Sequence, residues 1–119
     1  MKPTDRSGVI RLSDVRARIP GPAGERSSAV VHRGTLDVKL NALLPPNAKA
    51  THQQDEIYVV VGGRGIFVHN GQSDRFETGD FLFVAAGIEH YFDDFEELTL
   101  WRIYYGIKGG EIPRPDVRE

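Results

Sequence analysis

Two short segments of the chain carry side chains that can bind a divalent metal ion. Residues 51–58 contain His52 and Glu56, and residues 79–90 end in His90. Imidazole and carboxylate groups form open sites for Fe, Mn, Ni or Zn, and three protein ligands leave positions free for water or substrate. The two segments therefore indicate metal chemistry, and they say much less about a substrate.

Side chains along a β-strand alternate between its two faces, and this alternation explains how these residues could meet. In a strand, residues 52, 54 and 56 point to one face, so His52, Gln54 and Glu56 would project together, followed by Tyr58. Gln54 would then contact the metal or a substrate through its amide. The alternative is that His52 and Gln54 lie in a solvated loop. His90 has to arrive from a facing strand, and its own alternative is a hydrogen-bonded core histidine.

Strand-like patterns dominate the rest of the chain. Residues 36–43 alternate apolar and polar side chains, and residues 57–61, 81–84 and 98–105 are short apolar runs bounded by glycine or acidic residues. Helical apolar periodicity is lacking over any window of eleven residues. We therefore expect an all-β protein, an antiparallel sandwich or barrel.

One tight turn is visible in the sequence. Asn70-Gly71 supplies the positive φ angles of a two-residue hairpin, so residues 66–69 are expected to pair with residues 75–77. This pairing would add a hairpin to the predicted sheets.

The first metal-binding segment resembles a known motif. The cupin superfamily has a first motif of the form G-x5-H-x-H-x3,4-E-x6-G, and His52, Glu56 and Gly63 match its second histidine, its glutamate and its closing glycine. The motif's first histidine and first glycine are replaced by Ala50 and Leu44.

The second segment resembles the second cupin motif, G-x5-P-x-G-x2-H-x3-N. Gly79, Gly87 and His90 match it, whereas Ala85 replaces its proline and Asp94 its asparagine. The resemblance extends over about residues 36–105. It implies a small single-domain cupin with an antiparallel β-barrel, the double-stranded β-helix or jelly roll.

The resemblance also implies a function at the three remaining ligands. They would bind a divalent metal ion inside the barrel, with Glu56 both a ligand and a proton acceptor in catalysis. Cupins that this chain resembles include dioxygenases, isomerases, epimerases and lyases acting on small molecules. The loss of the first histidine at Ala50 favours a second hypothesis, a non-catalytic module that binds a metal or a small molecule. A third is a structural subunit whose barrel supports an interface.

Aromatic residues are expected first of all in the core. This group is Tyr58, Phe83, Phe92, Trp101 and Tyr104. A subset, with Tyr58 and Trp101 foremost, would line the mouth of a ligand cavity. For Arg102 we expect an exposed position, with pairing to a substrate carboxylate as the alternative. His32 and His69 match no motif position and are expected at the surface or a sheet edge.

The length of 119 residues predicts one domain. We divide it into an N-terminal arm or edge segment (1–28), a cupin barrel (29–107) and a mobile C-terminal tail (108–119). Because Pro20 and Pro22 break any regular element nearby, residues 9–12 would form at best a short edge strand, or an arm that lies over the barrel or a neighbouring subunit.

The composition and the charge distribution suggest where the protein is located and what it binds. Apolar residues make up 39% and charged residues 27%, and cysteine is absent, which excludes disulfides and thiolate metal sites. The N-terminus resembles no signal segment, so a cytoplasmic protein that binds neither membranes nor nucleic acid is expected. Seven basic residues oppose three acidic residues over residues 1–33, whereas eight acidic residues oppose one arginine over residues 74–97. We expect a homodimer in which the basic arm of one copy lies across its neighbour, because this would bring the basic segment close to an acidic one.

Overall fold

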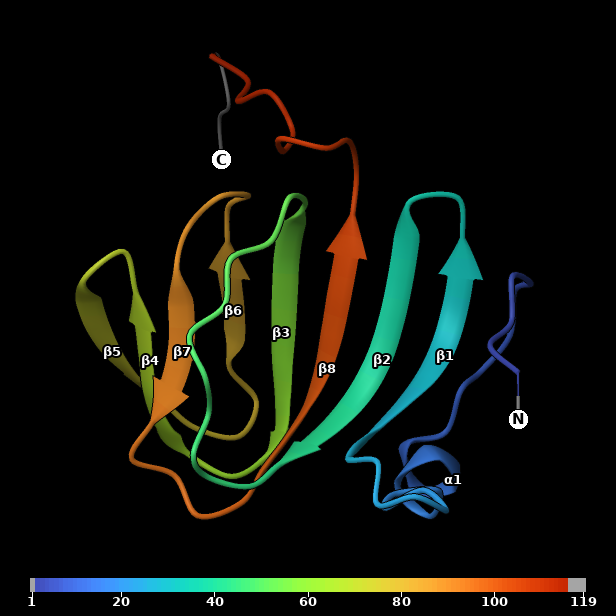
Figure 1. Cartoon of the computed structure of the whole chain (residues 1–119). Coiled ribbons are helices and arrows are strands. Elements are labelled where there is room, and N and C mark those ends of the chain that lie inside the picture. The colour runs from blue at the N-terminus through green and yellow to red at the C-terminus, as the bar shows by residue number, and fades with distance from the viewer. Residues whose placement is uncertain (1, 116–119) are drawn as a thin grey trace.

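The computed structural model describes residues 2–115, and these residues form an all-β fold with one short helix (Figure 1). The helix α1 comprises Leu12–Arg16. The strands are β1 (Ser27–Arg33), β2 (Leu36–Leu43), β3 (Asp55–Gly62), β4 (Gly65–His69), β5 (Gln72–Phe76), β6 (Phe81–Val84), β7 (His90–Asp93) and β8 (Leu98–Tyr105).

The strands form two antiparallel sheets, so the expected all-β, antiparallel class is confirmed. The larger sheet has the order β1-β2-β8-β3-β6, and the smaller has the order β5-β4-β7. Backbone hydrogen bonds do not join the described strands into one closed barrel. Closure of the barrel therefore stays a prediction.

The main core lies between the two sheets. Tyr58, Val60 and Leu100 of the larger sheet pack with Phe67 and Phe92 of the smaller sheet, and all five are buried. We call the side of the larger sheet that bears these residues its inner face. The alternation seen in the sequence explains this core, because every second side chain of β3 and β8 points inward.

The β4–β5 hairpin has the predicted turn. Asn70 and Gly71 have φ angles of 49° and 77°, and Ile66 pairs with Arg75. The second strand ends at Phe76, one residue earlier than expected, so Glu77 follows the strand.

The N-terminal segment differs from the expected edge strand at residues 9–12. Its strand-like contact is instead a parallel bridge between Thr4 and Val31, and Leu12 begins the helix α1. A helix of five residues is too short to show an apolar stripe and depends on tertiary packing. Here the packing comes from Val15, which is fully buried against Val30 and Leu40.

The first part of the predicted C-terminal tail is held against the core. The backbone N–H of Gly109 donates to the carbonyl oxygen of Gln53, and the N–H of Glu111 donates to a carboxylate oxygen of Asp55. The predicted tail also includes residues 116–119, which lie outside the described residues. None of the helices between residues 2 and 115 has the length and hydropathy needed to cross a membrane.

Two of the aromatic residues expected in the core, Phe83 and Trp101, lie on the other side of the larger sheet from the main core. Phe83 on β6 is 51% exposed, and Trp101 packs with Leu40 and Val15 on the opposite side of the sheet from the main core. Both occupy strand positions whose side chains point away from the smaller sheet, because Phe83 is opposite Ile57 and Trp101 is opposite Val59. We call this side of the larger sheet its outer face.

Candidate metal centre

Glu56 is the buried acid at the centre of the candidate site. It lies on the inner face of β3, between β6 and β8, where Val84 and Tyr104 are its neighbours in the sheet. The residue is 0% exposed. A carboxylate taken out of water in this way is stable only with a compensating cation or proton.

The two histidines reach Glu56 from outside β3. His52 lies on the connection from β2 to β3, and its carbonyl oxygen accepts a hydrogen bond from the N–H of Gly87. His90 begins β7 in the smaller sheet, and it forms an antiparallel bridge with Ala50 on that connection. This bridge holds the connection against β7, so that residues far apart in the sequence meet at one place.

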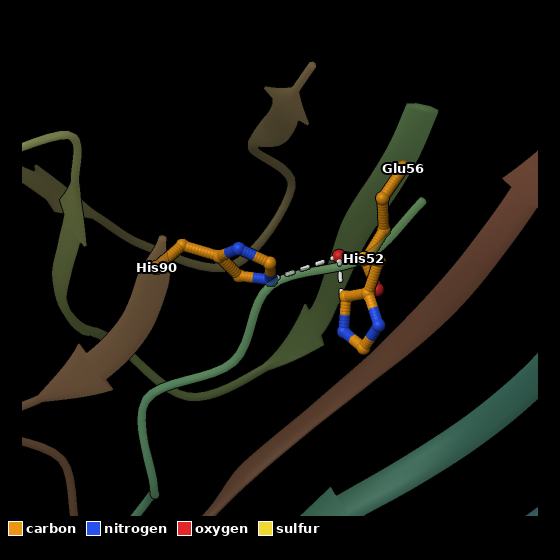
Figure 2. Close-up of side chains that lie close together, drawn as sticks. All are labelled: His52, Glu56 and His90. Carbon is orange, nitrogen blue, oxygen red and sulfur yellow. Dashed lines mark ion pairs between the residues drawn. The ribbon is translucent and has the colours of Figure 1, made fainter. Parts of the chain in front are cut away.

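The three side chains converge (Figure 2). His90 Nε2 lies 2.9 Å and His52 Nε2 lies 3.9 Å from Glu56 Oε1. One potential ligand atom from each residue lies within 4.8 Å of the others. The side chains of His90 and Glu56 are buried, whereas that of His52 is 33% exposed. An ion could therefore reach the group from the side of His52.

Two tyrosines support the histidines. The hydroxyl of Tyr58 lies 3.1 Å from His90 Nε2, and that of Tyr104 lies 3.1 Å from His52 Nε2. The other ring nitrogen of His90, Nδ1, donates to the carbonyl oxygen of Ile88 at 2.9 Å. This bond fixes the ring and directs Nε2 towards Glu56, as second-shell bonds do for metal-binding histidines.

Arg102 is the cation beside the acid. Its Nε lies 4.0 Å from Glu56 Oε2, and its guanidinium lies over the ring of Tyr104. Nε is buried without a hydrogen-bond partner. The expectation of an exposed arginine is wrong, because Arg102 follows the buried Leu98 and Leu100 at intervals of two on the inner face.

The pKa values of the four ring side chains are shifted by burial and by Glu56. Burial lowers the pKa of His52 below its ordinary value, and Glu56 only partly opposes this. Burial also acts to lower the pKa of His90, but the contacts with Glu56 and Ile88 together outweigh it and raise the pKa. Burial and Glu56 raise the pKa of both Tyr58 and Tyr104, so both hydroxyls remain protonated donors at neutral pH.

The residues fit a divalent metal ion by their chemistry. With Nδ1 donating to Ile88, a neutral His90 presents a lone pair on Nε2 to the carboxylate oxygen 2.9 Å away. Two lone pairs at this distance need a proton or a cation between them. Both oxygens of Glu56 are also buried without a well-aligned hydrogen bond. Adjacent ligand atoms about 2.1 Å from a common ion lie about 3 Å apart, which is close to the observed separation.

The other predicted contact residues are divided between the two faces. Tyr58 reaches the site through His90. Trp101 does not, because it points to the outer face. The amide of Gln54 donates to the carbonyl oxygens of Gly106 at 2.9 Å and Thr35 at 3.2 Å, so it ties the loop to neighbouring backbone instead of joining the cluster. His32 and His69 pair with Asp37 and Asp74, away from the cluster.

Sequence reasoning did not place Arg102 beside Glu56 or Tyr104 beside His52. The signal was present in the alternation of residues 98–105, which places Leu98, Leu100, Arg102 and Tyr104 on one face. The apolar pair identifies that face as internal, so the polar pair that follows it has to lie inside as well.

Comparisons with known proteins agree with this fold. The sequence profile of the Cupin domain family matches residues 40–97, which include His52, Glu56 and His90. No curated protein sequence gives a significant match.

Three solved structures illustrate the similarity in fold. A protein from Neisseria meningitidis is 20% identical with a TM-score of 0.69, over 83% of this chain and 100% of that one. A cupin-2 domain containing protein from Shewanella frigidimarina is 18% identical with a TM-score of 0.67, over 80% and 92% of the two chains. A cupin superfamily protein from Desulfitobacterium hafniense is 16% identical with a TM-score of 0.60, over 66% and 73%.

Proposed function

Because the chain is a small cupin-domain protein, we propose that it binds one divalent metal ion through His52, Glu56 and His90 and acts on a small molecule there. The observation that carries this proposal is the buried contact of 2.9 Å between His90 Nε2 and Glu56 Oε1. A mixed set of nitrogen and oxygen ligands suits Fe, Mn, Ni or Zn. We also propose that the two sheets are the halves of a jelly-roll barrel around this site.

The side chains around the ion would have distinct roles. A bound divalent ion would supply Lewis acidity to a carbonyl or enol oxygen of the substrate. Glu56 would serve as a ligand and as the proton acceptor. Tyr58 and Tyr104 lie beside the Nε2 atoms that would bind the ion, and they would keep their hydroxyl protons because the pKa values of both are raised. The partly exposed side of His52 would be the side from which the substrate enters.

The reaction types in keeping with this site are those of a dioxygenase, an isomerase or a lyase. A second candidate function is a module that binds a metal or a small molecule without turnover. The observation that favours it is Ala50, which lies opposite His90 and offers no ligand atom.

Metal analysis tests the proposed site. We expect about one ion per chain in protein purified without a nickel column, and none in a His90→Ala variant. A His69→Ala variant is the matched control, because His69 pairs with Asp74 outside the cluster. Added metal at about 100 times its Kd should stabilise the wild type by about 2.7 kcal/mol and leave His90→Ala unchanged. A wild type with neither bound metal nor a metal-dependent melting shift would refute the site.

Turnover then separates the enzyme from the module. Anaerobic loading with Fe(II), followed by oxygen uptake in the presence of diketones or catechols, would support a dioxygenase. Substrate conversion without oxygen uptake would support an isomerase or a lyase. Ligand-induced melting shifts without any turnover would favour the module.

A further inference from the structure

The outer face of the larger sheet bears two rows of apolar side chains. In the first row Phe83, Ile57, Ile103 and Val38 lie side by side across β6, β3, β8 and β2. In the second row Phe81 and Val59 are followed by Trp101 and Leu40. Helix α1 packs over that last pair through Val15. We call the remaining six residues, the first row with Phe81 and Val59, the outer patch.

The outer patch exposes its largest side chains. Phe81 is 63% and Phe83 is 51% exposed, and both lie on β6, which is an edge of the larger sheet. Surface phenylalanines that adjoin further apolar side chains in this way are typical of a face that another molecule covers. None of the six residues carries a charge that would deter such a contact.

The two edges of the same sheet carry opposite charge. The basic N-terminal segment lies along β1, where Thr4 bridges to Val31 (Figure 1). The turns on the two sides of β6 carry Glu77, Asp80 and Glu89 and no basic residue. Because β1 and β6 are the opposite edges of the sheet, a basic segment flanks one edge and acidic turns flank the other.

Because its two edges carry opposite charge, the sheet is complementary to a second copy of itself. We propose that a second copy of this chain covers the outer patch in a face-to-face dimer whose two-fold axis runs along the strands. That axis, centred on the patch, places β2 of each copy over β6 of its partner and β1 just beyond that edge, so the basic segment of each copy meets the acidic turns of the other. An axis across the strands would place like charges together.

The size of the face agrees with an interface that includes both edges. Three strands of about 26 Å (β2, β8 and β3) and one of about 13 Å (β6), spaced about 4.8 Å apart, present roughly 440 Å² of flat area. A stable interface of standard size needs roughly 800 Å² from each partner. The patch alone is too small, so the charged edges have to contribute. The metal-binding cluster lies on the inner face, so such a dimer would leave it accessible.

Light scattering tests the patch as the interface. The wild type should have twice the monomer mass of 13.3 kDa, and a Phe83→Lys variant should have the monomer mass with an unchanged circular dichroism spectrum. An Ile112→Lys variant is the matched control, because Ile112 is 82% exposed but lies in the C-terminal segment. It should remain a dimer. A monomeric wild type, or a Phe83→Lys variant that remains a dimer, overturns the proposal.

Crosslinking tests the direction of the axis. The chain has no cysteine, so a short bis-maleimide reacts only at introduced positions. A double variant, Val38→Cys with Phe83→Cys, should give a covalent dimer, because β6 of one copy lies over β2 of its partner. Each single variant should give little covalent dimer. A strong covalent dimer from Phe83→Cys alone would place β6 against β6, and it would overturn the proposed axis, as would a double variant that fails to crosslink.

Discussion

At the scale of single residues, the pair of His90 and Glu56 decides what the site can do. A buried carboxylate with no well-aligned hydrogen bond is unfavourable unless a positive charge lies next to it. Without metal, a proton on His90 supplies that charge, and Arg102 adds a more distant one at 4.0 Å. A bound metal ion would replace that proton. Metal binding and protonation would therefore compete for the same lone pair.

This competition predicts how the stability of the metal-free protein depends on pH. The pKa of His90 is raised above 6.5, so its contribution to stability is fully present below pH 6.5 and is lost as the pH rises through the folded pKa. The pKa of His52 is lowered, so His52 changes the stability of the protein only at pH values below 6.5. As the pH rises above 6.5, urea unfolding of the chelator-treated wild type should therefore show a loss of stability. A His90→Gln variant should lose less, and equal slopes for both proteins would contradict the assignment.

Ala50 predicts a gain of function. Opposed residues of an antiparallel pair project to the same face, so a longer side chain at 50 would point to the same side as His90. An Ala50→His variant should gain a fourth ligand and bind metal about tenfold more tightly, or about 1.4 kcal/mol. Competition with a chelating dye measures this affinity. The control is Ala48→His in the same connection, because Ala48 is exposed. Equal affinity in Ala50→His and the wild type would show that position 50 does not face the ion.

At the scale of elements, the connection from β2 to β3 positions the site as much as the strands do. It bridges to β7 at Ala50 and binds the turn before β7 through His52. The C-terminal segment after β8 then closes over the same loop, through Gly109 and Gln53. These contacts explain how His52 remains in place although it belongs to no strand.

Helix α1 is held by one buried side chain, and this predicts a strong effect of its truncation. Val15 is fully buried against Val30 and Leu40, so a Val15→Ala variant should lose about 2 kcal/mol of unfolding free energy. Urea denaturation measures this loss. A Val9→Ala variant is the control, because Val9 is 78% exposed, and it should change stability by less than about 0.5 kcal/mol. Similar losses in both variants would mean that the packing of α1 is not what stabilises the segment.

At the scale of the whole molecule, the two proposed sites lie on opposite faces of one sheet. The inner face holds the candidate metal centre, and the outer face bears the patch that we assign to a second copy. β3 contributes to both, because Glu56 points inward and Ile57 points outward. A change at the candidate metal centre therefore need not disturb the proposed dimer.

Dimerisation predicts a stability that depends on protein concentration. Because association stabilises the folded chain by mass action, the melting temperature of the wild type should rise by a few degrees when its concentration is raised about 100-fold. In Phe83→Lys the melting temperature should stay constant over the same range. Differential scanning fluorimetry measures both. A wild type with a constant melting temperature would speak against a dimer that forms in this range.

The sequence by itself determined several of the strands, one hairpin turn and the choice of candidate ligands. Alternation gave the bounds of β2 and β8, Asn70-Gly71 gave the hairpin, and spacing singled out the three candidate ligands. These features are local, because a strand's period and a turn's φ angles are set by neighbouring residues.

Only the tertiary structure decided what lies around those ligands and which face each strand residue joins. Arg102 and Tyr104 lie at the site, whereas Gln54 and Trp101 do not, because cross-strand register and loop contacts fix these positions. Helix α1 likewise forms only where Val15 finds Val30 and Leu40. Such contacts join residues distant in the chain, and no local pattern encodes them.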